Sequence, residues 1–263
     1  MKQIFGDEVR SIQLEILDEV HRFCGQNNIN YTLAYGTLIG AIRHKGYIPW
    51  DDDIDIAMPY PDFKRFLELF NQNNSKYGVI DVELNKKFPY ICAKVFKKNT
   101  LLLEPNNYEL GINIDLFPIY GMPQKQSEQI KHFNKIKRLH HKFLIIKNID
   151  LAKKRVWYKS FAIRVLRVLT AGLSFYNYRK LIKKYPYQNC AYAKITSFEM
   201  KTLAVFPKEC FEERVLADFE GRQYYIPAQY DKILREIYGD YMTPPPAEKQ
   251  KSHHVYQAFV TED

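Results

Sequence analysis

Residues 35–56 read YGTLIGAIRHKGYIPWDDDIDI, and the acidic end of this stretch indicates what kind of fold to expect. It places four carboxylates within five positions. Because Asp53 and Asp55 alternate with isoleucines, residues 53–58 are predicted to form a strand with the isoleucines in the core and both carboxylates on the other face. Crowded carboxylates repel one another, and a divalent cation relieves the repulsion. The stretch therefore predicts a sheet that carries a metal site.

A second stretch, GINIDLFP at residues 111–118, supplies a third carboxylate of the same kind. Asp115 lies between two apolar residues in a predicted strand over 111–119, so its neighbours in the chain are expected to be buried. Burial of the isoleucines in both strands would bring Asp53, Asp55 and Asp115 to one face of the sheet. We predict that these three are the catalytic residues and the ligands of Mg²⁺, with Mn²⁺ as the alternative.

Upstream of the acidic run, Gly36 and Thr37 precede a predicted helix over 37–43. A glycine and a hydroxyl at a helix N-terminus favour a phosphate contact. Arg43, His44 and Lys45 follow and are predicted to bind phosphate from the loop. Arg43 is the strongest of these candidates, because its planar fork suits phosphate, and solvated surface cations are the alternative for all three.

More distant cations are further candidates for the same site. Lys94 lies in a predicted strand over 90–96 and is a nucleotide-binding candidate. Lys249, His253 and His254 follow three consecutive prolines and are predicted to close over the site. Ordinary surface positions are the alternative for these C-terminal residues.

The rest of the chain alternates helical and strand patterns, which predicts an α/β (α+β) fold with a mixed sheet flanked by helices. The clearest further elements are a helix over 7–26, a helix beginning near Pro61, a hairpin over 215–227 around Gly221, and a helix over 230–238 that stops at Gly239.

Positive charge is concentrated in one block. Residues 131–184 hold 16 Lys and Arg against one acid, a net charge of +15, whereas the rest of the chain has a net charge of −6, and together they give +9. A block of this kind typically binds a partner that carries phosphates or other negative charge: nucleic acid, an anionic membrane or a polyanionic substrate. Lys159, Arg164 and Arg167 interrupt its apolar run, so a membrane-spanning helix is not expected. An interfacial helix on an anionic membrane and a helical subdomain packed on the protein both remain open.

These patterns divide the chain into a catalytic core at 1–130, a basic helical insertion at 131–187, and a part at 188–263 that completes the core and the active site. The first 16 residues carry three acids and no apolar core, which argues against a secretory signal. The four cysteines are scattered without a C-x-x-C pair. We therefore expect a cytoplasmic protein with reduced thiols, at the inner face of the plasma membrane if the block binds lipid.

The stretch 35–56 resembles the signature of the LicD family, bacterial phosphocholine transferases distantly similar to fukutin-related proteins. Residues 111–118, 219–221, 238–242 and 244–254 match the same pattern. The resemblance implies a nucleotidyltransferase-like fold. It also implies a CDP-choline or related CDP-alcohol donor, a glycan or teichoic acid precursor as acceptor, built on a lipid carrier, and release of CMP. No nucleic acid partner is expected. Thr37 stands where related folds often have Ser, and the hydroxyl is kept.

Other classes use some of the same residues. An EF-hand is excluded, because it needs Gly at 56 and Glu at 62, where this chain has Ile56 and Asp62. A nucleotide-sugar glycosyltransferase would use the Asp53-x-Asp55 pair but would not call for Asp115. A nucleotidyltransferase that transfers the nucleotide itself shares all three carboxylates. A membrane- or nucleic-acid-binding module explains the basic block alone.

Overall fold

The computed structural model describes residues 1–85, 88, 90–104, 109–147, 177–178, 180–196, 203–250 and 256–261. The helices are α1 (Gly6–Asn27), α2 (Tyr35–Arg43), α3 (Tyr60–Asn73), α4 (Gln126–Lys147), α7 (Glu209–Glu212) and α8 (Tyr230–Tyr238), with 3₁₀ turns η1 (Tyr187–Asn189) and η2 (Ala247–Lys249). The strands are β1 (Lys2–Ile4), β2 (Thr32–Leu33), β3 (Asp55–Pro59), β4 (Tyr77–Ile80), β5 (Ala93–Lys97), β6 (Thr100–Leu103), β7 (Glu109–Leu110), β8 (Asn113–Met122), β9 (Tyr192–Ile195), β10 (Phe206–Pro207), β11 (Arg214–Phe219), β12 (Arg222–Pro227) and β13 (Gln257–Val260).

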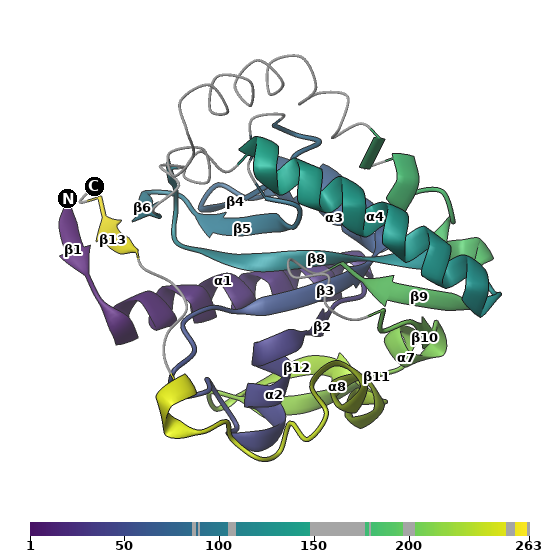
Figure 1. Ribbon diagram of the computed structural model, residues 1–263. Helices are drawn as coiled ribbons and strands as arrows, with labels where there is room; N and C mark the ends of the chain where they lie inside the picture. Colours follow the sequence, from purple (N-terminus) through teal and green to yellow (C-terminus); the bar gives the residue numbers. More distant parts are fainter. Residues whose placement is uncertain are drawn as a thin grey trace, which may run out of the picture.

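The central sheet has seven strands, and β8 is its longest (Figure 1). One edge of β8 pairs with β3 in parallel. Its other edge pairs antiparallel with β5 near the start and with β9 near the end. All ten residues of β8 are buried. A buried strand with partners on both edges is a rigid support, and it joins segments that lie far apart in the sequence.

Side chains alternate between the two faces of this sheet, as the sequence pattern predicted. Ile56, Ile114 and Leu116 are fully buried in a core that also contains the apolar faces of α1 and α3. Ala57 and Phe117 point the other way, into a second core with residues of β9 and α7. The predicted mixed α/β fold with flanking helices is therefore confirmed.

The helices follow the apolar spacing of the sequence. α1 buries Val9, Ile16 and Val20 and ends where Asn28 adopts a left-handed conformation, with φ +49°. α3 begins with Pro61 in its first turn, and α8 stops at Gly239. These predicted elements are confirmed with boundaries within a few residues.

Two predicted boundaries differ from the structure near the acidic stretch. β2 ends at Leu33, and Tyr35 already opens α2, because the chain turns directly from strand to helix at Ala34. Tyr35 has φ +45°, and its hydroxyl donates to the carbonyl of Thr196 at 2.7 Å. The strand predicted from residue 53 starts at Asp55, so Asp53 lies in the loop before it.

Most of the basic block lies outside the described residues. Its described part includes α4, which starts at Gln126 and so spans the predicted division at 130/131. α4 packs through Phe133 and Ile136 against Tyr178 and Ile182. No helix among the described residues is long and apolar enough to cross a membrane.

The two ends of the described chain lie side by side. β1 pairs with β13, which pairs with β6 and through it with β7, in a separate four-stranded sheet (Figure 1). A third, two-stranded sheet is the predicted hairpin β11–β12. Glu220 and Gly221 connect its strands with φ +53° and +71°, as in a type I′ turn.

Candidate active site

Three neighbouring strands bring Asp55, Asp115 and Lys94 into one row. Asp55 of β3 is the register partner of Asp115 of β8, and Asp115 is the register partner of Lys94 of β5. Register partners on adjacent strands project from the same face of a sheet. The two carboxylates and the lysine are thus held together by backbone pairing, and the Asp115 amide also donates to the Ile54 carbonyl at 2.8 Å.

Lys94 is the buried counter-charge of this row. Its Nζ lies 2.7 Å from Asp115 Oδ1, 2.9 Å from Asn113 Oδ1 and 4.0 Å from Glu104 Oε1. It also lies 4.7 Å from the centre of the Tyr90 ring. Burial is the largest single influence and lowers the pKa of Lys94, but the attraction of the surrounding negative groups, Asp115 first, and the hydrogen bond to Asp115 together outweigh burial and raise the pKa. Lys94 therefore stays charged and balances part of the acidic cluster.

Negative charge is nevertheless in excess around Asp55. Burial raises the pKa of Asp55 well above its usual range, and the charges of Asp53, Asp115 and Asp51 raise it further. Asp51, Asp52 and Asp53 each offer a carboxylate oxygen, and these oxygens lie within 4.8 Å of one another. A set of hard oxygen donors with excess negative charge fits Mg²⁺ or Mn²⁺.

The first turn of α2 lies against the acidic loop. A Cβ added to Gly36 would lie 2.5 Å from Asp51 Oδ2, so the glycine permits this close approach. Thr37 is buried, and its hydroxyl accepts a hydrogen bond from the Asp55 amide at 2.8 Å. Thr37 thus supports the strand that carries Asp55. Its phosphate contact stays a prediction.

The three loop cations predicted to bind phosphate have different surroundings. Arg43 donates to the Tyr241 carbonyl, which ties α2 to the segment after α8, and burial lowers the pKa of Arg43. His44 is partly buried beside Trp50, and its pKa is lowered by burial and by Arg43. Lys45 is exposed, with φ +59°. The guanidinium of Arg43 is therefore engaged in a hydrogen bond that joins two parts of the fold. Phosphate binding by Arg43, His44 and Lys45 stays a prediction.

The loop after α2 rests on the tip of the β11–β12 hairpin. Glu220 Oε1 accepts a hydrogen bond from the Tyr47 amide at 2.9 Å, and the Glu220 amide donates to the Lys45 carbonyl at 2.9 Å. Gly46 permits this contact, because a Cβ there would clash with Glu220 Oε1. The hairpin thus positions the loop that leads into the acidic stretch.

The C-terminal candidates are less well placed by the structure. Lys249 is exposed in η2. His253 and His254 lie outside the described residues. Their predicted closure over the site stays a prediction.

Sequence reasoning did not single out several residues that the structure places here. Asn113 shares a strand face with Asp115, two positions away, and this spacing was an available signal. Glu104 and Tyr90 come from segments whose pairing is not visible in the sequence. Cys92 Sγ lies 3.6 Å from Asp115 Oδ2, and burial raises the pKa of this thiol.

Comparison with known proteins assigns the family. The family described as LicD/FKTN/FKRP, nucleotidyltransferase domain, matches residues 28–147. The chain is also 32% identical over 271 aligned residues to the lipopolysaccharide cholinephosphotransferase LicD of Haemophilus influenzae, covering 99% of this chain and 100% of that protein. The chain belongs to the LicD family. The resemblance seen in the sequence is confirmed.

The LicD-family match includes the segments that build the row of charged residues. Residues 28–147 contain α2, the acidic loop, β3, β5 and β8.

Two uncharacterised rickettsial proteins match over shorter lengths. That of Rickettsia typhi is 41% identical over 61 residues, 22% of this chain and 20% of its own length. That of Rickettsia prowazekii is 44% identical over 73 residues, 27% of each chain.

Proposed function

We propose that this protein transfers phosphocholine, or a similar alcohol phosphate, from a CDP-linked donor to a sugar hydroxyl of a cell-surface glycan or teichoic acid precursor, with release of CMP. The observation that carries the proposal is the near full-length likeness to a lipopolysaccharide cholinephosphotransferase. The row Asp55–Asp115–Lys94 supports it, because phosphoryl transfer depends on positioned charges more than on covalent chemistry.

We propose Asp53, Asp55 and Asp115 as the ligands of Mg²⁺, with Mn²⁺ as the alternative. The crowding that raises the pKa of Asp55 supports this assignment. When bound, the cation would neutralise charge on the diphosphate of the donor. Asp51 is a further oxygen donor beside the site, because its carboxylate lies against Gly36 in the first turn of α2.

The chain's own groups have separate tasks in this proposal. The acceptor oxygen forms a bond to the phosphorus next to the alcohol, the bond from that phosphorus to the CMP oxygen breaks, and the acceptor proton leaves. Asp115 is proposed to take that proton or to complete the metal site. Lys94 holds one oxygen of Asp115 at 2.7 Å and so fixes its orientation. The N-terminus of α2, at Gly36, is proposed to face a donor phosphate.

The proposed glycan acceptor also suggests where the reaction takes place. A glycan acceptor built on a lipid carrier would be met at the cytoplasmic face of the membrane, and a cytoplasmic enzyme with a basic block suits that surface.

The test is to incubate the protein with CDP-choline, Mg²⁺ and a lipopolysaccharide-type glycan and to identify the products by mass spectrometry. CMP together with a glycan that carries phosphocholine is the expected result. A glycan that carries the nucleotide would instead indicate a nucleotidyltransferase, and transfer of sugar from a nucleotide sugar would indicate a glycosyltransferase.

A matched pair of variants ties the product to the site. Asp53→Asn should abolish transfer and the rise in melting temperature that Mg²⁺ and CDP-choline produce together. Asp7→Asn makes the same change on the exposed first turn of α1 and should leave both unchanged. Near-normal transfer by Asp53→Asn would contradict the metal assignment.

A further inference from the structure

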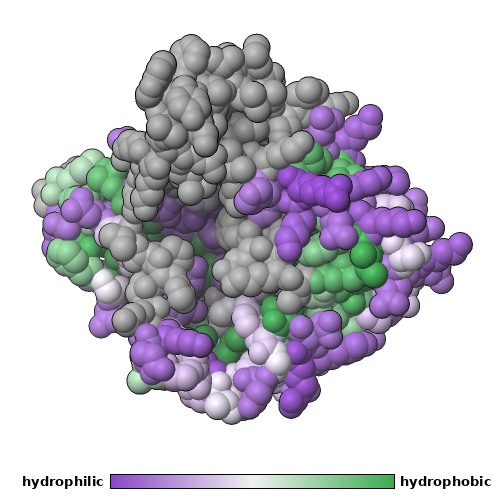
Figure 2. Space-filling view, in the orientation of Figure 1, coloured by the Kyte–Doolittle hydropathy of each residue, from purple (hydrophilic) through white to green (hydrophobic). Residues whose placement is uncertain are grey.

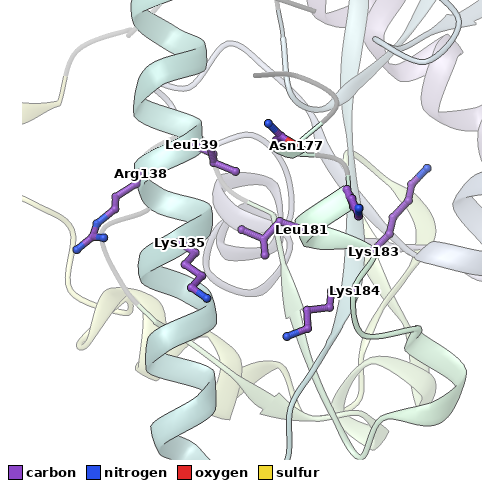
Figure 3. Close-up of a pocket in the computed structure, with 8 residues that line it drawn as sticks. Lys135, Arg138, Leu139, Asn177, Leu181, Lys183 and Lys184 are labelled. Atoms are coloured by element: carbon purple, nitrogen blue, oxygen red, sulfur yellow. The ribbon is translucent and has the colours of Figure 1, made fainter. Parts of the chain in front are cut away.

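A cavity lies between α4 and the described residues 177 and 180–184 (Figure 3). Its volume is about 950 Å³. That is the size of sites that hold whole small ligands. The described residues that line it include five cations, one asparagine and two leucines: Lys135, Arg138, Leu139, Asn177, Lys180, Leu181, Lys183 and Lys184. No acid is among these described lining residues.

The cations of this cavity differ in whether an acid balances them. Lys183 pairs with Glu83 and points away from α4 (Figure 3). No ion pair with an acid of the described chain is found for Lys135, Arg138, Lys180 or Lys184. Burial, and after it the charges of Lys184 and Lys135, together lower the pKa of nearby His132 to about 4. Several positive charges are therefore held around one space, which an anion would stabilise.

The cavity also has an apolar part. Leu139 of α4 and Leu181 point toward one another across it (Figure 3). The outer surface over α4 is mostly hydrophilic, with hydrophobic residues exposed beside it (Figure 2). A free phosphate would use the cations and leave the exposed parts of both leucines in water. A molecule with a phosphate and an acyl chain would use both.

We propose that this cavity binds the phosphate headgroup of an anionic lipid at a membrane surface, with the start of an acyl chain against Leu139 and Leu181. The site is separate from the row of carboxylates and would hold the protein beside a lipid-linked acceptor. Its use for that acceptor rests on the proposed function, but the binding itself does not.

Vesicle co-sedimentation tests the binding without donor or acceptor. Vesicles of equal parts phosphatidylcholine and phosphatidylglycerol should bind the protein, and pure phosphatidylcholine vesicles should not. Lys135→Glu/Lys184→Glu should weaken binding at least ~10-fold. Lys76→Glu/Lys232→Glu changes the net charge equally at exposed lysines elsewhere and should stay within ~3-fold of the wild type. Equal losses in the two variants, or no binding by the wild type, would overturn the proposal.

A soluble pair of ligands separates a lipid from a free phosphate. Dihexanoyl phosphatidylglycerol, below its micelle concentration, should bind at least ~10-fold more tightly than glycerol phosphate, because it also buries apolar surface. Equal affinities would overturn the lipid assignment. Lys135→Ala/Lys184→Ala, checked by thermal melting, replaces the Glu variant if that variant does not fold. Normal vesicle binding without choline phosphate transfer would contradict only the proposed function, and transfer to a soluble acceptor without vesicle binding would contradict only this inference.

Discussion

The ammonium of Lys94 lies 2.7 Å from a carboxylate oxygen of Asp115, and both side chains are almost entirely buried. An ion pair of this kind lies in the row that also holds Asp55. Removal of one partner leaves the other charge buried without compensation, which is far more costly than loss of a surface pair. The pair therefore links the stability of the fold to the charge balance of the site.

Lys94→Met should lower the free energy of unfolding by about 3–5 kcal/mol, because it leaves the Asp115 carboxylate buried without its counter-charge. Lys97→Met is the control on the same strand, since Lys97 pairs with Glu15 at 2.5 Å in a partly exposed position. It should cost at most about 1 kcal/mol. Urea titration measures both. Similar losses for the two variants would show that Lys94 is not a buried counter-charge.

The double variant Lys94→Met/Asp115→Asn separates a structural role of Asp115 from a catalytic one. It should be more stable than either single variant, because neither partner of this ion pair is left buried without the other. Turnover should still be reduced at least ~100-fold, since the carboxylate is absent. Unfolding curves and product formation are measured on the same preparations. Recovery of turnover along with stability would assign Asp115 a structural role only.

The raised pKa of Asp55 predicts a pH-dependent stability in the presence of EDTA. Because the folded protein holds this proton more tightly than the unfolded chain, the free energy of unfolding should decrease as pH rises from about 4 through the raised pKa. Asp55→Asn should remove that decrease and make the protein more stable than the wild type at neutral pH.

The measurement is the difference in melting temperature between Asp55→Asn and the wild type from acid to neutral pH. Asp7→Asn, on the exposed first turn of α1, is the control and should keep the decrease in stability that the wild type shows as pH rises, because it retains Asp55. Added Mg²⁺ should raise the melting temperature of the wild type most at neutral pH, where Asp55 binds it in competition with fewer protons. A pH-independent difference for Asp55→Asn would contradict the crowding of charge around it.

Gly36→Ala should reduce turnover without reducing stability. The added Cβ would lie 2.5 Å from Asp51 Oδ2, so the carboxylate would have to move, while alanine favours the helix. Gly25→Ala in α1 meets no atom within 4 Å and should raise stability by about 0.5–1 kcal/mol with normal turnover. Normal kinetics for Gly36→Ala would show that the approach of Asp51 to α2 has no functional role.

The contact between Glu220 and the Tyr47 amide is expected to hold the loop before the acidic stretch in place. Glu220→Ala removes the acceptor for the Tyr47 amide and should cost about 1.5–3 kcal/mol. Glu220→Gln keeps an acceptor oxygen and should retain most of the stability and turnover. Amide exchange at Tyr47 reports the bond directly, and an unchanged rate in Glu220→Ala would contradict the contact.

Much of the site could be predicted because strand periodicity is local. The alternation around Asp55 and Asp115 was enough to assign each to a strand face, and burial of Ile56 and Ile114 confirms the alternation. The strand-to-helix turn before Gly36 was less visible, since Tyr35 adopts a conformation that bulky residues rarely use.

The partners of these residues could not be predicted, because they depend on long-range pairing. The register of β5 with β8 decides that Lys94 faces Asp115, and no local pattern encodes it. The same holds for Arg43, whose bond to the Tyr241 carbonyl spans 198 positions of the chain. The hydroxyl of Thr37, which is predicted to contact phosphate, also accepts a hydrogen bond from the Asp55 amide, and no local pattern encodes that bond.

The pairing of β8 on both edges has a consequence for how the site is lost. The amide of Asp115 donates to Ile54 inside a strand whose ten residues are all buried. Such an amide exchanges with solvent only when the whole sheet opens. Partial unfolding events that expose termini or surface turns will therefore leave the carboxylate row assembled, and a protease that cuts only locally opened segments will release fragments from elsewhere in the chain first.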